Sequence, residues 1–462
     1  MKIKRLIIFY KVAALCLYLP TSLNGQGINN YLRSMDINHN LATDTNDWKG
    51  FRKIKEIPLT RHDQQVNLSI GGEIREQLRV YNHINYGDTK PDKDFFLLQR
   101  YMVHADLKLN NTFRIFGQLN STHVNWKNTI GQNDRDYLGF MQAFIDIKVP
   151  SYPMRLRIGR QEFLFGSERI LGPRDGPNNR QTYDGLRYTL SFKKVTGDFL
   201  LVSPVAPKPF LFDNHHIKNY LIFSGYWTFS LKSKSILDLY YFGINRQNIT
   251  ELSGKTTEQR NSYGARISKP VESFFYDIEG TWQRGTSLSQ VINGWHLTTV
   301  TGYKWKNTRM SPRIQIKGAV FSGNKDSTDN QNNSFVPVSA KPPVNDMLPV
   351  GPTNLFLLVP EVELKINKSI ALTMRYFAIW RLRRTDGLYS TDMERMIRKP
   401  DLPGENNGNF AAGGPTTEIY YTAGKHLNIS INISYFIPGE YVKKTGAGKD
   451  LQAMIIKIYY KF

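Results

Sequence analysis

A regular alternation of apolar and polar residues, repeated along almost the whole chain, is the feature that most constrains the fold. Within residues 68–81, Ile74 lies on one face and Arg75 on the other. A period of two residues indicates a β-strand, because successive side chains point to opposite faces of a sheet. Residues 95–109 repeat the pattern, and Glu76 is an exception because it falls on the apolar face.

Sixteen more segments follow the same pattern, so the sequence predicts about eighteen strands. They begin near Thr112, Tyr137, Met154, Arg180, Lys194, Tyr220, Lys234, Glu258, Glu272, Trp295, Ser311, Pro352, Ser369, Gly413, His426 and Leu451. Short links such as Asn110-Asn111 alternate strictly with long ones such as residues 323–351 and 383–412. An even strand count, short periplasmic turns and long extracellular loops are typical of a transmembrane antiparallel β-barrel. Only a closed barrel leaves no sheet edge facing lipid.

The composition excludes two other classes of protein. Hydrophobic residues make up 40% of the chain, and after the N-terminus no stretch approaches the roughly 20 apolar residues that a spanning helix needs. Aromatic residues reach 13%, too many for a disordered chain. Lys+Arg number 61 against 39 Asp+Glu, which gives a formal net charge of +22. A helical membrane bundle and a disordered protein are therefore both excluded.

Residues 1–25 have the layout of a secretory signal peptide. Basic residues precede an apolar stretch over residues 6–19, and small and polar residues then run to Gly25, where we expect cleavage. The only cysteine, Cys16, lies in this segment, so the mature chain has no thiol for a disulfide or a thiolate metal site. We expect residues 26–67 to form a periplasmic N-terminal arm or plug and residues 68–462 to form the barrel.

Aromatic clusters and the C-terminus support a membrane location. Tyr240-Tyr241-Phe242, for example, suits an aromatic girdle at the lipid headgroups, although cross-strand packing would also enrich aromatic residues. The chain ends on Phe462 after an alternating strand, as outer-membrane barrels of Gram-negative bacteria typically do. We therefore expect the lipid bilayer, lipopolysaccharide and the barrel-assembly machinery as partners.

Facing the apolar side of each strand toward lipid places many basic residues in the lumen. The candidate pore-lining and substrate-binding arginines are Arg75, Arg79, Arg100, Arg114, Arg155, Arg157, Arg187, Arg266, Arg313, Arg375 and Arg381, with Lys108, Lys317, Arg383 and Lys457 on the same faces. Fewer acids share these faces: Glu73, Asp106, Asp146, Asp277, Glu279, Glu361 and Glu363. A wall with excess positive charge concentrates anions, so the sequence predicts an anion-selective pore. The structural alternative is that these basic residues pair with acids and only hold the lumen open.

Arginine dominates this set, and its chemistry indicates a class of substrate. A planar guanidinium group binds a carboxylate through two parallel hydrogen bonds and is always charged. A series of such groups could pass a polymer of carboxylates from site to site, provided that each site releases its ion readily.

Nothing in the sequence favours catalysis or a cofactor. The nucleophile-elbow, zinc-protease, phosphate-loop and dinucleotide motifs are absent. His215-His216 beside Asp213 is the only pair of adjacent histidines with an aspartate next to it, and it lies in a loop. We expect no metal or other cofactor, and the exported location disfavours nucleic acid as a partner. Asp326 and Asp329 could bind calcium, but their spacing does not match an EF-hand.

Four stretches, of which the first two form one signature, resemble motifs of a known family. Residues 155–174 read RLRIGRQEFLFGSERILGPR, residues 178–188 read NNRQTYDGLRY, residues 378–389 read AIWRLRRTDGLY and residues 435–441 read YFIPGEY. Together they resemble the alginate-export family of outer-membrane β-barrels. The residues that match its central signature are Gly159, Arg160, Gln161, Glu162, Gly166, Arg169, Arg180, Tyr183, Asp184, Gly185 and Arg187.

The resemblance implies an eighteen-stranded monomeric barrel with an arginine-lined lumen that passes an acidic polysaccharide such as alginate or its oligomers. It adds Arg160, Glu162 and Asp184 to the candidate pore-lining residues, although these three could instead form a structural salt-bridge cluster in the barrel wall. A general anion-preferring porin is an alternative. An outer-membrane lipase-type hydrolase, for which His104 and His296 are the strand candidates, and a surface adhesin also remain open.

Overall fold

The computed structural model describes residues 49–55, 57–59, 66–149, 151–251, 254–270, 272–287, 290–326, 328–339, 347, 350–391, 393 and 396–462. The predicted signal peptide and most of the predicted N-terminal arm lie outside these residues. No helix in the described ranges is long and apolar enough to cross a membrane.

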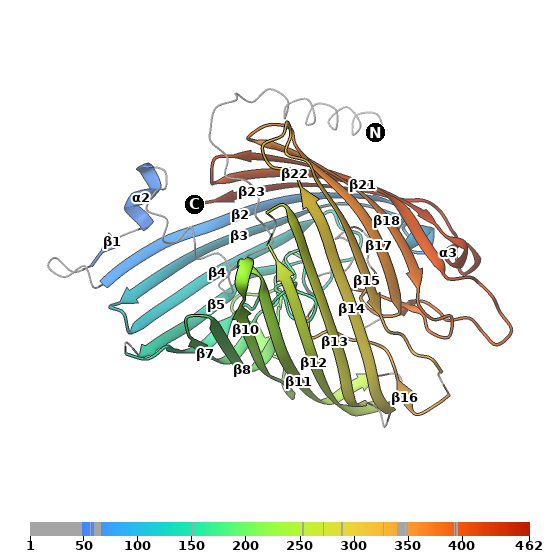
Figure 1. The fold of residues 1–462 in the computed structure, drawn as a ribbon, viewed down its shortest axis with the longest axis horizontal. Helices are drawn as coiled ribbons and strands as arrows, with labels where there is room; N and C mark the ends of the chain where they lie inside the picture. Colours follow the sequence, from blue (N-terminus) through green and yellow to red (C-terminus); the bar gives the residue numbers. More distant parts are fainter. Residues whose placement is uncertain are drawn as a thin grey trace.

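Eighteen long antiparallel strands form a closed barrel (Figure 1). They are β2 (Val66–Asn82), β3 (Lys93–Leu109), β4 (Phe113–Asn125), β5 (Asp136–Val149), β6 (Met154–Gln161), β7 (Tyr183–Ser191), β8 (Val195–Ala206), β10 (Tyr220–Ser230), β11 (Ile236–Glu251), β12 (Gly254–Lys269), β13 (Phe274–Ser287), β14 (Gln290–Lys304), β15 (Arg313–Phe321), β17 (Leu355–Lys365), β18 (Ile370–Arg381), β21 (Phe410–Ala423), β22 (Leu427–Pro438) and β23 (Leu451–Lys461). Pairing of β2 with β23 closes the ring, so that Glu73 lies opposite Lys461. The predicted fold and strand number are confirmed, and each predicted strand begins within five residues of an observed one.

The two faces of the wall differ as the alternation predicts. Along β3, Arg100 and Asp106 are buried on the inner face, whereas Val103 is half exposed on the outer face. The outer face carries many exposed large apolar side chains, which suits contact with lipid. Glu76, the exception in the pattern, lies on this outer face, where the Tyr101 hydroxyl donates a hydrogen bond of 2.7 Å to its carboxylate.

The connections divide into a turn end and a loop end, although less strictly than the sequence predicts. The C-terminus lies at the turn end with α2 (Lys49–Lys55), and α3 (Glu440–Lys444) lies at the loop end (Figure 1). Two links at the loop end are short, because β11 ends at Glu251 just before β12 begins, and β13 ends at Ser287 just before β14 begins. The expectation of strict alternation between short and long links is therefore wrong at these two hairpins.

The described N-terminal residues contact the turn end of the barrel. β1 (Ile57–Pro58) pairs with the first residues of β2. The Phe51 ring of α2 lies 5.2 Å from the His426 ring and 6.1 Å from the Phe462 ring, centroid to centroid. Ser69 donates a hydrogen bond to the Lys55 carbonyl oxygen. These contacts fix α2 to the wall beside the C-terminus, and whether the preceding residues form an arm or a plug stays a prediction.

Long loops fold into the barrel and build an apolar core there. The loops 162–182 and 322–354 meet through a parallel bridge between Leu171 and Ser339. Phe165 and Phe335, one from each loop, are buried with inward-facing strand residues such as Tyr240 and Phe242. The interior beside β8, β10 and β11 is therefore apolar.

This core also changes the prediction for one aromatic cluster. Tyr240 and Phe242 face inward and only Tyr241 faces outward, so the first two cannot belong to a lipid-facing girdle.

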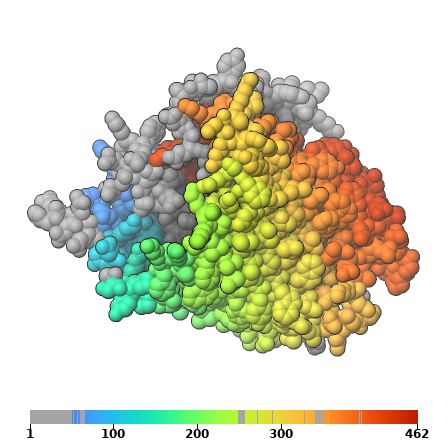
Figure 2. Space-filling model, viewed as in Figure 1, coloured from blue at the N-terminus to red at the C-terminus, as the bar shows by residue number. Residues whose placement is uncertain are grey.

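Figure 2 shows the outer wall on one side of the molecule, where segments of the second half of the chain follow one another in sequence order.

Candidate functional site

Of the twelve arginines that alternation assigns to the lumen, Arg383 lies in the loop after β18, and the other eleven lie on the inner face of the wall. Five of them are nearly inaccessible to solvent: Arg75, Arg100, Arg157, Arg187 and Arg381. Arg157 and Arg187 follow a local rule, since the outward positions on either side of them carry apolar or aromatic side chains, whereas Arg75 and Arg100 each have one polar neighbour, Glu76 and Gln99. Their contacts decide which of them could meet a solute.

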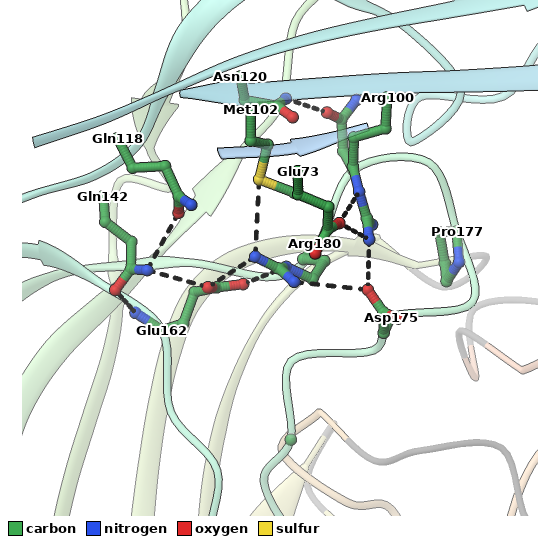
Figure 3. A network of polar contacts seen from close by, with 12 residues as sticks. Glu73, Arg100, Met102, Gln118, Asn120, Gln142, Glu162, Asp175, Pro177 and Arg180 are labelled. Carbon is green, nitrogen blue, oxygen red and sulfur yellow. Dashed lines mark hydrogen bonds and ion pairs between the residues drawn. The ribbon is translucent and has the colours of Figure 1, made fainter. Parts of the chain in front are cut away.

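The largest polar cluster joins the inner face of β2 and β3 to the loop 162–182 (Figure 3). One Arg100 nitrogen, Nη2, lies 2.8 Å from a Glu73 oxygen and 2.7 Å from an Asp175 oxygen. Arg180, within the loop, forms a 2.7 Å ion pair with Glu162 and lies 3.6 Å from the same Asp175 oxygen. Two guanidinium groups therefore converge on one loop carboxylate.

Backbone atoms of the loop complete this cluster. Arg75 donates to the carbonyl oxygens of Asp175 at 2.7 Å and Pro177 at 2.9 Å. Arg79 donates to the carbonyl oxygen of Gly176 at 2.7 Å. The Asn178 amide donates to backbone carbonyl oxygens of β3, of β4 and of the segment before β5. Residues 175–178 are thus fixed to the wall by side chains that the barrel supplies.

Asp175 is the electrostatic centre of the cluster. Burial alone would raise the pKa of its carboxyl group, but the guanidinium groups of Arg100, Arg180 and Arg75 outweigh burial and hold that pKa well below its usual value of 3.8. The Tyr459 hydroxyl on β23 donates to the second carboxylate oxygen at 2.7 Å. Asp175 is therefore ionised at neutral pH and bound from two sides.

Toward the turn end, inward arginines pair with inward acids on neighbouring strands. Arg114 lies 2.7 Å from Asp106 and 3.3 Å from Asp146. Arg157 lies 2.7 Å from Asp146. Arg187 on β7 forms a corresponding 2.6 Å pair with Asp198 on β8.

The opposite wall shows the same pairing. Arg266 bridges Asp238 at 2.8 Å and Asp277 at 2.7 Å. Glu361 accepts from both Lys317 and Arg375 at 2.6 Å. Further ion pairs on these inner faces are Arg313 with Glu361 and Glu363, Arg375 with Glu418, and Glu258 with Arg260 and Arg246. The wall is therefore a set of matched charges, and not a ladder of unpaired arginines.

At the loop end, Arg381 connects a loop with a helix. Its guanidinium group donates to Asp401 at 2.7 Å and to the carbonyl oxygen of Gly408 at 2.8 Å. It also lies over the Tyr441 ring of α3, at 3.8 Å from the ring centroid. These contacts tie the loop 382–409 to α3.

The three residues that the family motif adds do not share one location. Glu162 is buried inside the barrel, where it pairs with Arg180. Arg160 and Asp184 instead form a 2.7 Å ion pair on the outer face, on the same side of their strands as the exposed Ile158 and Leu186. The prediction that Arg160 and Asp184 line the pore is therefore wrong, because Gly159 and Gly185 occupy the inward positions beside them.

The outer ion pair holds a loop against the wall. Arg160 donates to the carbonyl oxygens of Asn214 and Phe140, each at 3.3 Å. Backbone hydrogen bonds join residues 209 and 212 of the loop 207–219 to the start of β5. This loop thereby covers the outer face where the short strand β6 ends and the short strand β7 begins.

Sequence reasoning missed Asp175, Tyr459 and Asn178 as parts of the cluster. Asp175 and Asn178 lie in a loop without periodicity, and Tyr459 lies on the last strand, distant in sequence from both. The only feature of the sequence that pointed to this cluster was the position of Glu162 and Arg180 at the two ends of the loop that carries Asp175.

The histidines offer no assembled catalytic group. Within the described residues, His296 contacts the Thr281 hydroxyl at 2.8 Å, and His104 stacks on Phe116. His123 lies 3.1 Å from the Ser121 hydroxyl on the outer face, but that hydroxyl donates to the Tyr137 carbonyl oxygen. No group of three potential metal ligands occurs in the same ranges.

Comparison with known proteins gives one family and one fold. The model of the family described as alginate export matches residues 66–453. No curated protein sequence matches the chain.

Solved structures with the same fold are outer-membrane-type channels of low sequence identity. OccK2 (OpdF) of Pseudomonas aeruginosa, in complex with glucuronate, has a TM-score of 0.58 at 10% identity and covers 86% of this chain and 98% of its own. OccAB3 of Acinetobacter baumannii has a TM-score of 0.56 at 11% identity, covering 85% and 99%. OccK5 (OpdH) of Pseudomonas aeruginosa has a TM-score of 0.53 at 14% identity, covering 85% and 98%.

Proposed function

The chain belongs to the alginate export family, an outer-membrane channel family of Gram-negative bacteria, and we propose that its lumen passes anionic sugars. The substrate class that we infer is an acidic polysaccharide such as alginate, or its oligomers. The observation that carries this proposal is the convergence of Arg100 and Arg180 on the Asp175 carboxylate inside the barrel, beside Arg75, which donates to the Asp175 carbonyl oxygen.

The chemistry of that cluster supports a carboxylate as the recognised group. A guanidinium group forms short, charge-assisted hydrogen bonds with carboxylates and stays charged at every relevant pH. A uronic acid polymer presents one carboxylate per sugar, so a site that binds one carboxylate can bind each sugar in turn. The related fold of OccK2 holds glucuronate, which is also an acidic sugar.

The matched charges elsewhere suit a conduit. Pairs such as Arg157 with Asp146 lower the field along the wall, so that no single position traps an anion. An excess of positive charge is still expected to favour entry of anions over cations. A general anion-preferring porin would share these properties, and the experiment below separates the two functions.

We further propose how the barrel reaches and occupies the membrane. Residues 1–25 act as the signal peptide, the assembly machinery recognises the C-terminal strand that ends in Phe462, and the barrel works as a monomer in contact with lipopolysaccharide. The exposed apolar side chains on the outer face, such as Ile115, Ile145 and Trp295, support contact with lipid.

Block of single-channel current by sugars tests the substrate class. The refolded protein is inserted into planar bilayers and titrated with uronic acid oligomers, with neutral oligomers of equal length as the control. We expect the acidic oligomers to block at concentrations at least tenfold lower than the neutral ones. Equal block by both would contradict an acidic-sugar conduit and favour a general porin.

A further inference from the structure

We propose that the Asp175 carboxylate is an internal ligand of the channel. It occupies the place where the carboxylate of an acidic sugar binds, and each passing carboxylate displaces it. The inference rests on the proposed function, because it names the site at which the acidic sugar is recognised and explains how that sugar is released.

The contacts of Asp175 are those of a bound carboxylate ligand. Its Oδ1 atom lies 2.7 Å from Arg100 Nη2 and 3.6 Å from Arg180 Nη1. Its Oδ2 atom accepts a 2.7 Å hydrogen bond from the Tyr459 hydroxyl. Donors from β3, β23 and the loop itself therefore surround both oxygens, as Figure 3 shows for the two arginines.

Exposure distinguishes Asp175 from the groups that bind it. The Asp175 side chain is 31% exposed, whereas the side chains of Arg100 and Arg180 are 0% and 4% exposed. Water in the lumen thus reaches the carboxylate but not the guanidinium groups behind it. A solute carboxylate can reach Arg100 only by taking the place of Asp175.

The site stays cationic when Asp175 leaves. Glu73 and Glu162 each bind one guanidinium group, of Arg100 and Arg180 respectively. The described contacts of Arg75 go to backbone carbonyl oxygens and the Asn178 amide oxygen, so this third guanidinium group has no carboxylate of its own. The cluster therefore keeps a positive charge that a solute carboxylate can neutralise.

An internal competitor suits a conduit better than an empty site would. A carboxylate fixed on the same loop is present at high effective concentration, and it weakens the apparent affinity of any solute that must replace it. Each sugar is then bound just long enough to be selected, because Asp175 returns as the sugar leaves.

Removal of the competitor tests the inference. Glucuronate is titrated against single-channel current of the wild type, Asp175→Asn and Asp175→Ala. Asp326→Asn is the matched control, because it removes the same charge from an exposed position whose hydrogen bonds, among the described residues, go to Thr328. The amide variant keeps the size of the side chain, so that loop packing can be separated from charge.

We expect the half-blocking glucuronate concentration to fall about tenfold in both Asp175 variants and to stay unchanged in the control. Unchanged or weaker block in the variants, with the wild type blocked, would overturn the internal ligand and leave the proposed function standing. Block of the variants alone, with an unblocked wild type, would support the internal ligand. Absence of block in all four proteins would overturn both the inference and the proposed function.

Discussion

Glu361 and Arg375 face each other across β17 and β18, with 2.6 Å between Oε2 and Nε. The same Glu361 oxygen accepts from Lys317 at 2.6 Å, and the other oxygen accepts from Gln315. One buried carboxylate thus holds two cations of adjacent strands on the inner wall.

Neutralising that carboxylate should change both stability and selectivity. In Glu361→Gln, Lys317 loses its ion pair and Arg375 keeps only the one with Glu418. Removing one partner of a buried pair costs about 3 kcal/mol or more. We expect a lower urea midpoint of unfolding in liposomes together with a stronger preference for anions in reversal-potential measurements. Asp326→Asn is the control for the loss of one acid. Unchanged ion selectivity in the Glu361 variant would mean that this part of the wall does not set the electrostatic field in the pore.

The outer ion pair should affect a loop but not the pore. In Arg160→Met, Asp184 and the carbonyl oxygens of Phe140 and Asn214 lose their donor. We expect faster proteolytic cleavage within the loop 207–219 and unchanged ion selectivity. A change of selectivity would show instead that Arg160 contributes to the lumen field.

The depressed pKa of Asp175 predicts how the channel responds to acid. Because the folded pKa lies below the usual 3.8, the stabilising ion pairs are fully present above that value and are lost only as the pH falls through the lower, folded pKa. Wild-type current in glucuronate should therefore stay constant between about pH 7 and pH 5, well above the unperturbed pKa. Convergence of the wild type on Asp175→Asn within this range would contradict an ionised, arginine-bound Asp175.

A cross-link can test whether the two inner loops stay together during conduction. Leu171 and Ser339 lie opposite each other in the parallel bridge, a spacing that suits a disulfide between cysteines. The native chain has one cysteine, Cys16, within the predicted signal peptide, so a Leu171→Cys and Ser339→Cys double variant should form a single bond. We expect equal conductance of its oxidised and reduced forms, and a large increase on reduction would show that the loops separate in the open state.

The sequence was sufficient to predict the strands of the wall and the faces of their side chains, because both follow a local rule. Alternation placed Arg100 and Arg375 on the inner face correctly, since a strand presents its side chains with a period of two. The prediction of a lipid-facing girdle, which rested on aromatic clustering, failed for Tyr240 and Phe242, because loops that fold into the barrel make part of its interior apolar. When both faces of a strand are apolar, alternation no longer distinguishes them.

The polar cluster could be predicted only in part. Arg75, Arg100 and Glu162 were expected to line the pore, but the cluster that they form with Arg180 and Asp175 depends on the path of the loop 162–182, which no periodicity records. Arg160 and Asp184 were assigned to the lumen through the motif, and the motif does not distinguish a pore residue from a residue that fixes a loop to the outer wall.

The reversal potential of the wild-type channel under a KCl gradient tests the central claim most directly. The account predicts a potential of the sign that chloride selectivity produces, reduced when uronic acid oligomers are added to occupy the arginine cluster. A potential of the opposite sign, showing preference for potassium, would contradict the proposal that this barrel is a conduit for anionic sugars.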